Sequence, residues 1–236
     1  MPLFWSVERD GDTVVVNCPE PLRCAHETHP AWMGQCAGAI RDELRQLGIA
    51  EGTLLEAAVA GDELPLGETL LYEVGIPQTH VGVGVRLTRM PAAAAGVVQR
   101  YRHAAVGTTS PDDAAVLLAS LRVPITDGHE LDTAHAVWLA TRDAMNAALP
   151  AGAASTTGGV DLRVRFVTGA ARTQGTVEVI RRLLDGVSAS VFGSADATGS
   201  ELSPADDRIR TAEVTFVRGA SPQLEIDLRA LPGRGA

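Results

Sequence analysis

The segment Asp161 to Val167, with the sequence DLRVRFV, places apolar and charged residues alternately. A period of two is typical of a β-strand that is buried on one face and polar on the other. The segment from Met33 to Leu47 has a different period, because its apolar residues recur every three or four positions, as on one stripe of an α-helix. A chain in which the two periods alternate predicts a mixed α/β fold.

The predicted elements follow one another in the same order in each half of the chain. In the first half we predict, in order, a hairpin over 4–17, a helix over 30–47, a strand over 53–59, a helix over 68–74 and a strand over 81–87. In the second half we predict, in order, an extended segment over 123–125, a helix over 132–148, a strand over 161–167, a helix over 177–187 and strands over 213–217 and 223–228. We therefore expect an α/β (α+β) protein of two related β-α-β-α-β units in tandem. The alternative is that an order so common in mixed domains aligns with itself by chance.

Three segments follow from this order. Residues 1–91 form the amino-terminal α/β unit, and residues 122–236 form the carboxyl-terminal one. Between them, residues 92–121 begin with four alanines after Pro91 and continue with an apolar run, which we interpret as a helical connector.

Composition limits the kind of protein this is. The formal net charge is -9, which argues against a protein that grips nucleic acid with its whole surface. No apolar run approaches the ~20 residues that a membrane-spanning helix needs, and the amino terminus lacks the pattern of a signal peptide. The three cysteines lie within the first 36 residues, and their odd number fits reduced thiols. We therefore expect a cytoplasmic, acidic protein that does not engage membranes.

The segment VEVIRRLLDGV, residues 177–187, carries an apolar helical stripe with Arg181, Leu184 and Asp185-Gly186 at its end, and Asp206-Asp207 follow in a later loop. With the two closing strands, this pattern resembles the RusA-type crossover-junction endonucleases. The resemblance covers residues 122–230 and implies a small α/β fold, magnesium as cofactor and branched DNA as substrate. It would assign Asp206 and Asp207 to the metal site, with Glu178 as a substitute acid.

The acids that open the family's helix motif are missing, since they fall at Gly175 and Val177. Neither side chain can coordinate a metal ion, and two-metal phosphodiester hydrolysis needs clustered carboxylates. We therefore expect a pseudoenzyme: a non-catalytic protein on a degenerate, duplicated RusA-like fold that binds a partner, which we expect to be another protein. The enzyme alternative is a magnesium-dependent, structure-specific nuclease that uses Glu178, Asp206 and Asp207.

A second group of chemically active side chains lies near the amino terminus. Cys24, His26, His29 and Cys36 are ligand types that zinc prefers. Their spacing matches no common structural zinc site, and Cys36 falls on the predicted apolar stripe of a helix. One interpretation is a zinc-binding protein or a small-molecule enzyme that uses this region; the other is a buried cysteine beside loop histidines.

The arginines gather in the second half of the chain. Residues 1–92 hold 6 Arg and 13 acids, whereas residues 93–236 hold 14 Arg and 16 acids. One interpretation is a local basic groove, open to nucleic acid, formed by five of these arginines: Arg163, Arg165, Arg181, Arg182 and Arg208. The alternative is that these arginines are solvated and pair with neighbouring acids.

Overall fold

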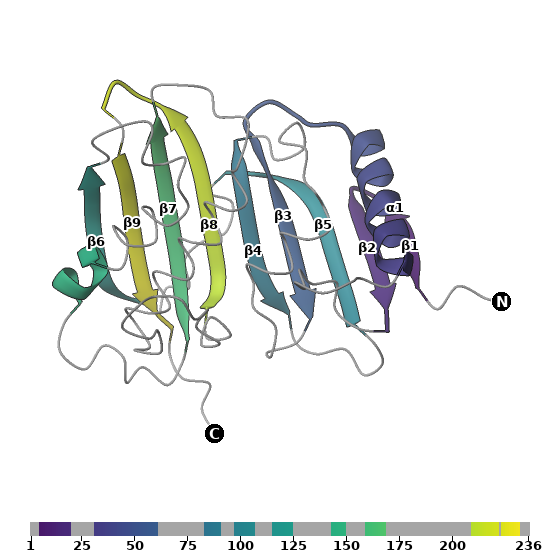
Figure 1. The fold of residues 1–236 in the computed structure, drawn as a ribbon, viewed down its shortest axis with the longest axis horizontal. Helices are drawn as coiled ribbons and strands as arrows, with labels where there is room; N and C mark the ends of the chain where they lie inside the picture. Colours follow the sequence, from purple (N-terminus) through teal and green to yellow (C-terminus); the bar gives the residue numbers. More distant parts are fainter. Residues whose placement is uncertain are drawn as a thin grey trace. The chain divides into compact units, whose positions relative to one another are not determined.

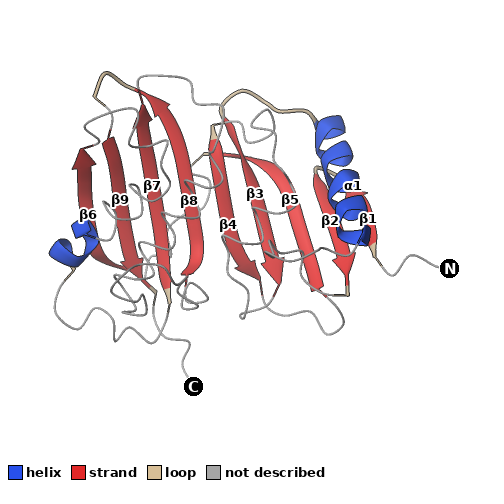
Figure 2. Ribbon diagram, in the orientation of Figure 1, coloured by secondary structure: helices blue, strands red, loops and turns tan. Residues whose placement is uncertain are grey.

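The computed structural model describes residues 5–19, 31–60, 83–90, 97–106, 115–124, 143–149, 159–168, 209–221 and 223–231. The chain divides into two compact units, Met1–Thr108 and Thr109–Ala236, called unit 1 and unit 2 below. The described residues form a mixed α/β structure that is mostly sheet (Figures 1 and 2), which agrees with the fold class predicted from the sequence. Among these residues, no helix is both long enough and apolar enough to cross a membrane.

Unit 1 contains five strands and one helix among its described residues. In chain order they are β1 (Ser6–Asp10), β2 (Thr13–Cys18), α1 (Ala31–Leu47), β3 (Thr53–Ala60), β4 (Gly84–Met90) and β5 (Val97–Ala105). The strands lie in the order β1-β2-β5-β3-β4. Neighbouring strands are antiparallel, except that β3 and β4 are parallel.

Helix α1 ends where its sequence predicts, at Leu47, because Gly48 adopts a positive φ of 71° that most other residues avoid. Its buried residues form one stripe: Met33, Cys36, Ala37, Ile40 and Leu44. Arg9 of β1 donates a hydrogen bond to the Glu43 carboxylate of α1 at 2.8 Å. Because Arg9 is in register with the fully buried Val14 of β2, α1 covers the sheet face on which Val14 lies. The opposite face of unit 1 is therefore the one that can hold polar side chains.

Unit 2 contains four described strands. They are β6 (Val116–Pro124), β7 (Val160–Thr168), β8 (Ile209–Arg218) and β9 (Gln223–Ala230), in the order β8-β7-β9-β6. Here β7 and β8 are parallel, and the other neighbours are antiparallel. Residues 143–148, between β6 and β7 in the chain, are helical, and Met145 among them is fully buried.

The two units share one strand order and one pattern of strand directions. The series β2-β5-β3-β4 of unit 1 corresponds to β6-β9-β7-β8 of unit 2, with the parallel pair at the same end. In unit 1, Thr13 of β2 and Glu56 of β3 are both in register with Arg102 of β5, and Glu56 follows Thr13 by 43 residues (13 to 56). In unit 2, Ser120 of β6 and Arg163 of β7 are both in register with Asp227 of β9, and Arg163 again follows by 43 residues (120 to 163). The number of residues between register-matched positions is therefore the same for β2 and β3 in unit 1 as for β6 and β7 in unit 2.

The ends of the strands give a residue-by-residue correspondence. Thr53–Ala105 is the terminal register pair of β3 and β5, and Val160–Ala230 is the terminal pair of β7 and β9. When these pairs are matched, Glu56 of β3 corresponds to Arg163 of β7.

The helical connector predicted for residues 92–121 is wrong. Its described residues belong to β5 and β6 instead, and the division between the units falls between Thr108 and Thr109. β5 pairs with β2 on one edge and with β3 on the other, and its Tyr101 is 1% exposed. Pairing along both edges of a central strand outweighs the weak helical preference of the preceding alanines. The helices predicted over 68–74 and 177–187 lie outside the described residues.

Candidate anion-binding site

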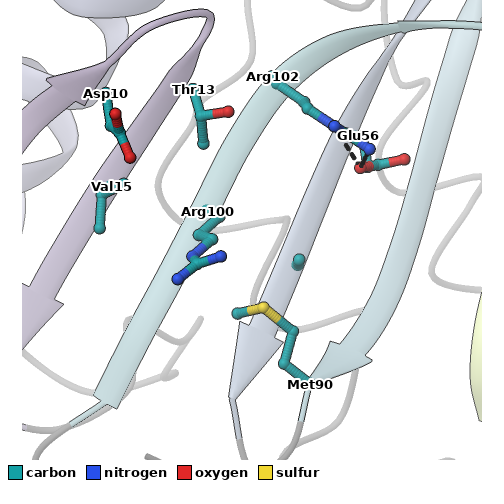
Figure 3. A pocket seen from close by; sticks show the side chains of 8 residues that line it. Asp10, Thr13, Val15, Glu56, Met90, Arg100 and Arg102 are labelled. Carbon is teal, nitrogen blue, oxygen red and sulfur yellow. Dashed lines mark hydrogen bonds and ion pairs between the residues drawn. The ribbon is translucent and has the colours of Figure 1, made fainter.

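A hollow of about 240 Å³ lies on the polar face of unit 1 (Figure 3). All five strands of the unit contribute to its lining, which consists of Asp10, Thr13, Val15, Glu56, Ala58, Met90, Arg100 and Arg102. The register explains why these side chains share one face. Arg102 stands opposite Thr13 and Glu56, and Arg100, two residues before it, stands opposite Val15 and Ala58.

Glu56 is the centre of an ion-pair network at one side of the hollow. Its carboxylate accepts hydrogen bonds from Arg86 at 2.9 Å and from Arg102 at 2.6 Å. The Arg86 side chain is fully buried, whereas the Arg102 side chain is 47% exposed. Burial raises the pKa of Glu56, but the hydrogen bonds and charges of Arg102 and Arg86 outweigh it, and the pKa is lowered overall. Glu56 is therefore ionised at neutral pH and compensates the buried charge of Arg86.

Arg100 differs from these two arginines because no side chain in the described ranges forms an ion pair or a hydrogen bond with its guanidinium. Figure 3 shows Arg100 beside Val15 and Met90, while the Arg102 side chain turns towards Glu56. The neighbours of Arg100 in register, Val15 and Ala58, carry no charge. A guanidinium with apolar neighbours and open space in front of it can receive a carboxylate through two parallel hydrogen bonds.

Unit 2 has charged side chains at the corresponding positions. The correspondence of the strands matches Arg100 with Glu225, Val15 with Arg122 and Ala58 with Arg165. Glu225 accepts a hydrogen bond from Arg165 at 2.9 Å and lies 3.6 Å from Arg122. The hydrogen bond from Arg165 is the main cause that lowers the pKa of Glu225, and the charges of Arg165 and Arg122 act in the same direction. Unit 2 thus supplies two counter-charges where unit 1 has two small apolar residues and a hollow.

The arginines predicted to line a basic groove are only partly within the described residues. Arg163 and Arg165 share one face of β7, as predicted. Arg165 pairs with Glu225, and Arg163 is in register with Glu213 and Asp227, so each arginine has at least one acid as its neighbour in register. This arrangement matches the alternative of arginines paired with neighbouring acids. Arg181, Arg182 and Arg208 lie outside the described residues.

The predicted metal ligands are not brought together in the part of the chain that the structure describes. Glu178, Asp206, Asp207, Cys24, His26 and His29 all lie outside it, so the nuclease and zinc hypotheses stay predictions. Cys36 lies on the buried stripe of α1. The described residues contain no group of three or more His, Cys, Asp or Glu side chains able to hold a metal ion.

Glu56, Arg86, Arg100 and Arg102 are not among the functional residues predicted from the sequence. The signal for two of them was present in the segment Gln99-Arg100-Tyr101-Arg102, in which the arginines alternate with residues that prove to be buried. Read as a strand rather than as a helix, this alternation places both arginines on one face. No local pattern signals Glu56 or Arg86, because their pairing depends on the register between strands.

Comparison with known proteins gives no family assignment. No protein-family model matches the chain, and no curated protein sequence matches it either. One similar solved structure is that of a cyanuric acid hydrolase, with 9% sequence identity, coverage of 95% of this chain and 67% of the other, and a TM-score of 0.28. So low a TM-score supports no conclusion about fold or function.

Proposed function

We propose that this chain is a binding protein and that the hollow of unit 1 takes up a small organic acid, whose carboxylate pairs with Arg100. The observation that carries the proposal is that Arg100 has no charged partner among the described residues, at the position where unit 2 holds Glu225 between two arginines. A ligand carboxylate would supply the counter-charge that unit 1 lacks.

The size and lining of the hollow limit the ligand. Its volume of about 240 Å³ lies below the range of about 300–1,000 Å³ that is usual for pockets of drug-sized ligands, so the hollow suits a small ligand. Val15, Ala58 and Met90 provide an apolar wall for that ligand. Asp10 also lines the hollow, which disfavours a second negative charge at the far end of the ligand. A monocarboxylate with a short aliphatic chain fits these requirements.

The ionisation of Glu56 favours binding over catalysis in this hollow. A general base works best when its pKa lies near the working pH. Because the pKa of Glu56 is lowered and two arginines occupy its carboxylate, it is a weak base with little capacity to accept a proton. Glu56 therefore holds the arginines in place, which is a structural role.

Binding of hexanoate, a probe of eight non-hydrogen atoms, tests the proposal. We expect chemical-shift changes in the amides of β2, β3 and β5 when the full chain is titrated. A hydrogen bond to a charged group contributes about 1.5–3 kcal/mol, so Arg100→Gln should weaken binding about tenfold or more. Ala58→Glu should have the same effect by giving Arg100 an internal partner.

The matched control is Arg45→Gln. Arg45 is an exposed arginine of α1 that pairs with Asp42 at 3.1 Å, outside the lining of the hollow. This variant should bind hexanoate as the wild type does. Equal affinity of the wild type and of Arg100→Gln, or no binding by the wild type at millimolar hexanoate, would refute the proposal.

We further propose that the two units arose by internal duplication. The common strand order, the parallel pair at the same end and the step of 43 residues support a shared origin. A duplication also requires equivalent elements between the parallel strands, where the sequence predicts helices over 68–74 and 177–187. Backbone chemical shifts measured on the full chain test this requirement: helical shifts in both segments support duplication, and helical shifts in only one contradict it.

A further inference from the structure

Among the described residues, the outer edge of unit 2 has no counterpart of the strand β1 of unit 1. In unit 1, β2 pairs with β5 on one edge and with β1 on the other, through the antiparallel pairs from Ser6–Asn17 to Asp10–Thr13. In unit 2, β6 occupies the position of β2 and pairs with β9. No strand in the described part of the chain pairs with the other edge of β6, which ends the strand order.

This edge is apolar, unlike the edge formed by β1. Val116 and Leu117 of β6 are 64% and 52% exposed, more than the other exposed large hydrophobic residues in the described ranges. Over its nine residues β6 carries a single charge, that of Arg122. β1 is only five residues long and carries three charges, those of Glu8, Arg9 and Asp10. Short and charged edge strands resist further pairing, whereas long and apolar ones promote it.

We propose that the outer edge of β6 pairs antiparallel with β6 of a second copy of this chain and forms a symmetric dimer. Unit 1 shows the kind of element that covers this edge, since β1 lies antiparallel beside β2. A twofold axis makes a strand antiparallel to its own copy, so one contact both completes the missing strand and closes the assembly. The proposal is independent of the ligand proposed for the hollow of unit 1.

The charges on and around β6 favour a second copy over a charged partner. Arg122 lies 3.6 Å from Glu225 within its own unit, so pairing two copies of β6 does not bring together two uncompensated charges. The apolar Val116 and Leu117 of both copies lose exposure in the same contact, which is the main source of stability. Because each copy has a net charge of -9, long-range repulsion opposes association, and added salt should strengthen the dimer by screening it.

Sedimentation velocity on the full chain tests the dimer. The wild type should change from the monomer mass of 24.7 kDa to twice that mass as its concentration rises. Leu117→Lys places a charge at the paired edge and should raise the dissociation constant at least about tenfold, given the apolar area lost from both copies. Val106→Lys is the matched control, because Val106 is 45% exposed and lies in unit 1; it should dimerise as the wild type does.

Hydrogen exchange of the wild type provides a second measurement that needs no variant. Amides of β6 should become more protected as the concentration rises, while those of the β1 edge should not change. A wild type that stays monomeric up to about millimolar concentration, or a Leu117→Lys variant that is folded and still dimeric, would overturn the proposal. A monomer that instead pairs β6 with a foreign extended peptide would overturn it too.

Discussion

Replacing Glu56 with Gln should destabilise unit 1 strongly, although the two side chains have nearly the same size. Glu56 holds Arg86 at 2.9 Å, and the Arg86 side chain is fully buried. The substitution removes the negative charge and leaves a hydrogen-bonding amide. It therefore tests whether the charge itself, rather than the shape of the side chain, stabilises the polar face.

The structure gives the size of the expected effect. Removing one partner of a buried ion pair costs about 3–5 kcal/mol, because the buried charge that remains loses the stabilisation this partner gave it. Two features place Glu56→Gln at the lower end, at about 3 kcal/mol: the glutamine oxygen still accepts one hydrogen bond, and Arg102, which is 47% exposed, can return to water. With a urea dependence of about 1–3 kcal/mol per molar, the midpoint of unfolding should fall by about 1–3 M.

Urea denaturation followed by circular dichroism measures this change. Glu225→Gln is the matched control, since Glu225 also pairs with two arginines, Arg165 and Arg122, but both arginine side chains are more than half exposed. Exposed ion pairs contribute little to stability, so this control should shift the midpoint far less. Equal midpoints for the wild type and Glu56→Gln would show that the Glu56 charge does not compensate Arg86, and the argument would fail.

Two further predictions concern the same network. Because the pKa of Glu56 is lowered in the folded protein, its carboxylate contributes stability above the unfolded-state pKa of about 4.3 and loses that contribution as the pH falls through the folded-state pKa. The difference in unfolding free energy between the wild type and Glu56→Gln should therefore be largest near pH 7 and shrink below about pH 4. A difference that does not change with pH would contradict the direction of the pKa shift. The second prediction is that Glu56→Arg destabilises unit 1 and that adding Arg86→Glu and Arg102→Asp restores most of the lost stability. The triple variant reproduces the residues of unit 2 at the corresponding positions, which are Arg163, Glu213 and Asp227. Urea midpoints measure both variants, and a triple variant no more stable than the single one would argue against the correspondence of the two faces.

Elements with a strong local pattern could be predicted from the sequence. The hairpin around Gly11 and the helix that ends before Gly48 are both confirmed, and at each position a glycine with positive φ permits the turn or the helix end. Strands β3, β7, β8 and β9 likewise contain the predicted strand segments, because their apolar residues follow a period that no local signal contradicts.

The candidate site could not be predicted, because sequence separation hides it. Glu56 is 30 residues from Arg86 and 46 residues from Arg102, and only the register of three strands brings these side chains together. The error over residues 92–121 had a further consequence, because it assigned Arg100 and Arg102 to a helix, where residues two apart face different directions. Because a helical period was assigned to residues that form a strand, the sequence did not indicate that Arg100 and Arg102 share the face on which the hollow lies.

The comparison of the two units shows how charged residues on these faces are placed against opposite charges. Glu56 is in register with Arg86 and Arg102, whereas Arg163 at the corresponding position is in register with Glu213 and Asp227. The charge at each of the three positions has the opposite sign in the other unit. Opposite charges therefore remain neighbours in register, although none of the three residues is the same. Two residues further along the strands, Glu225 has two arginine partners, whereas the exposed Arg100 of unit 1 has no charged partner among the described residues. Arg100 is therefore the residue at which a ligand is expected.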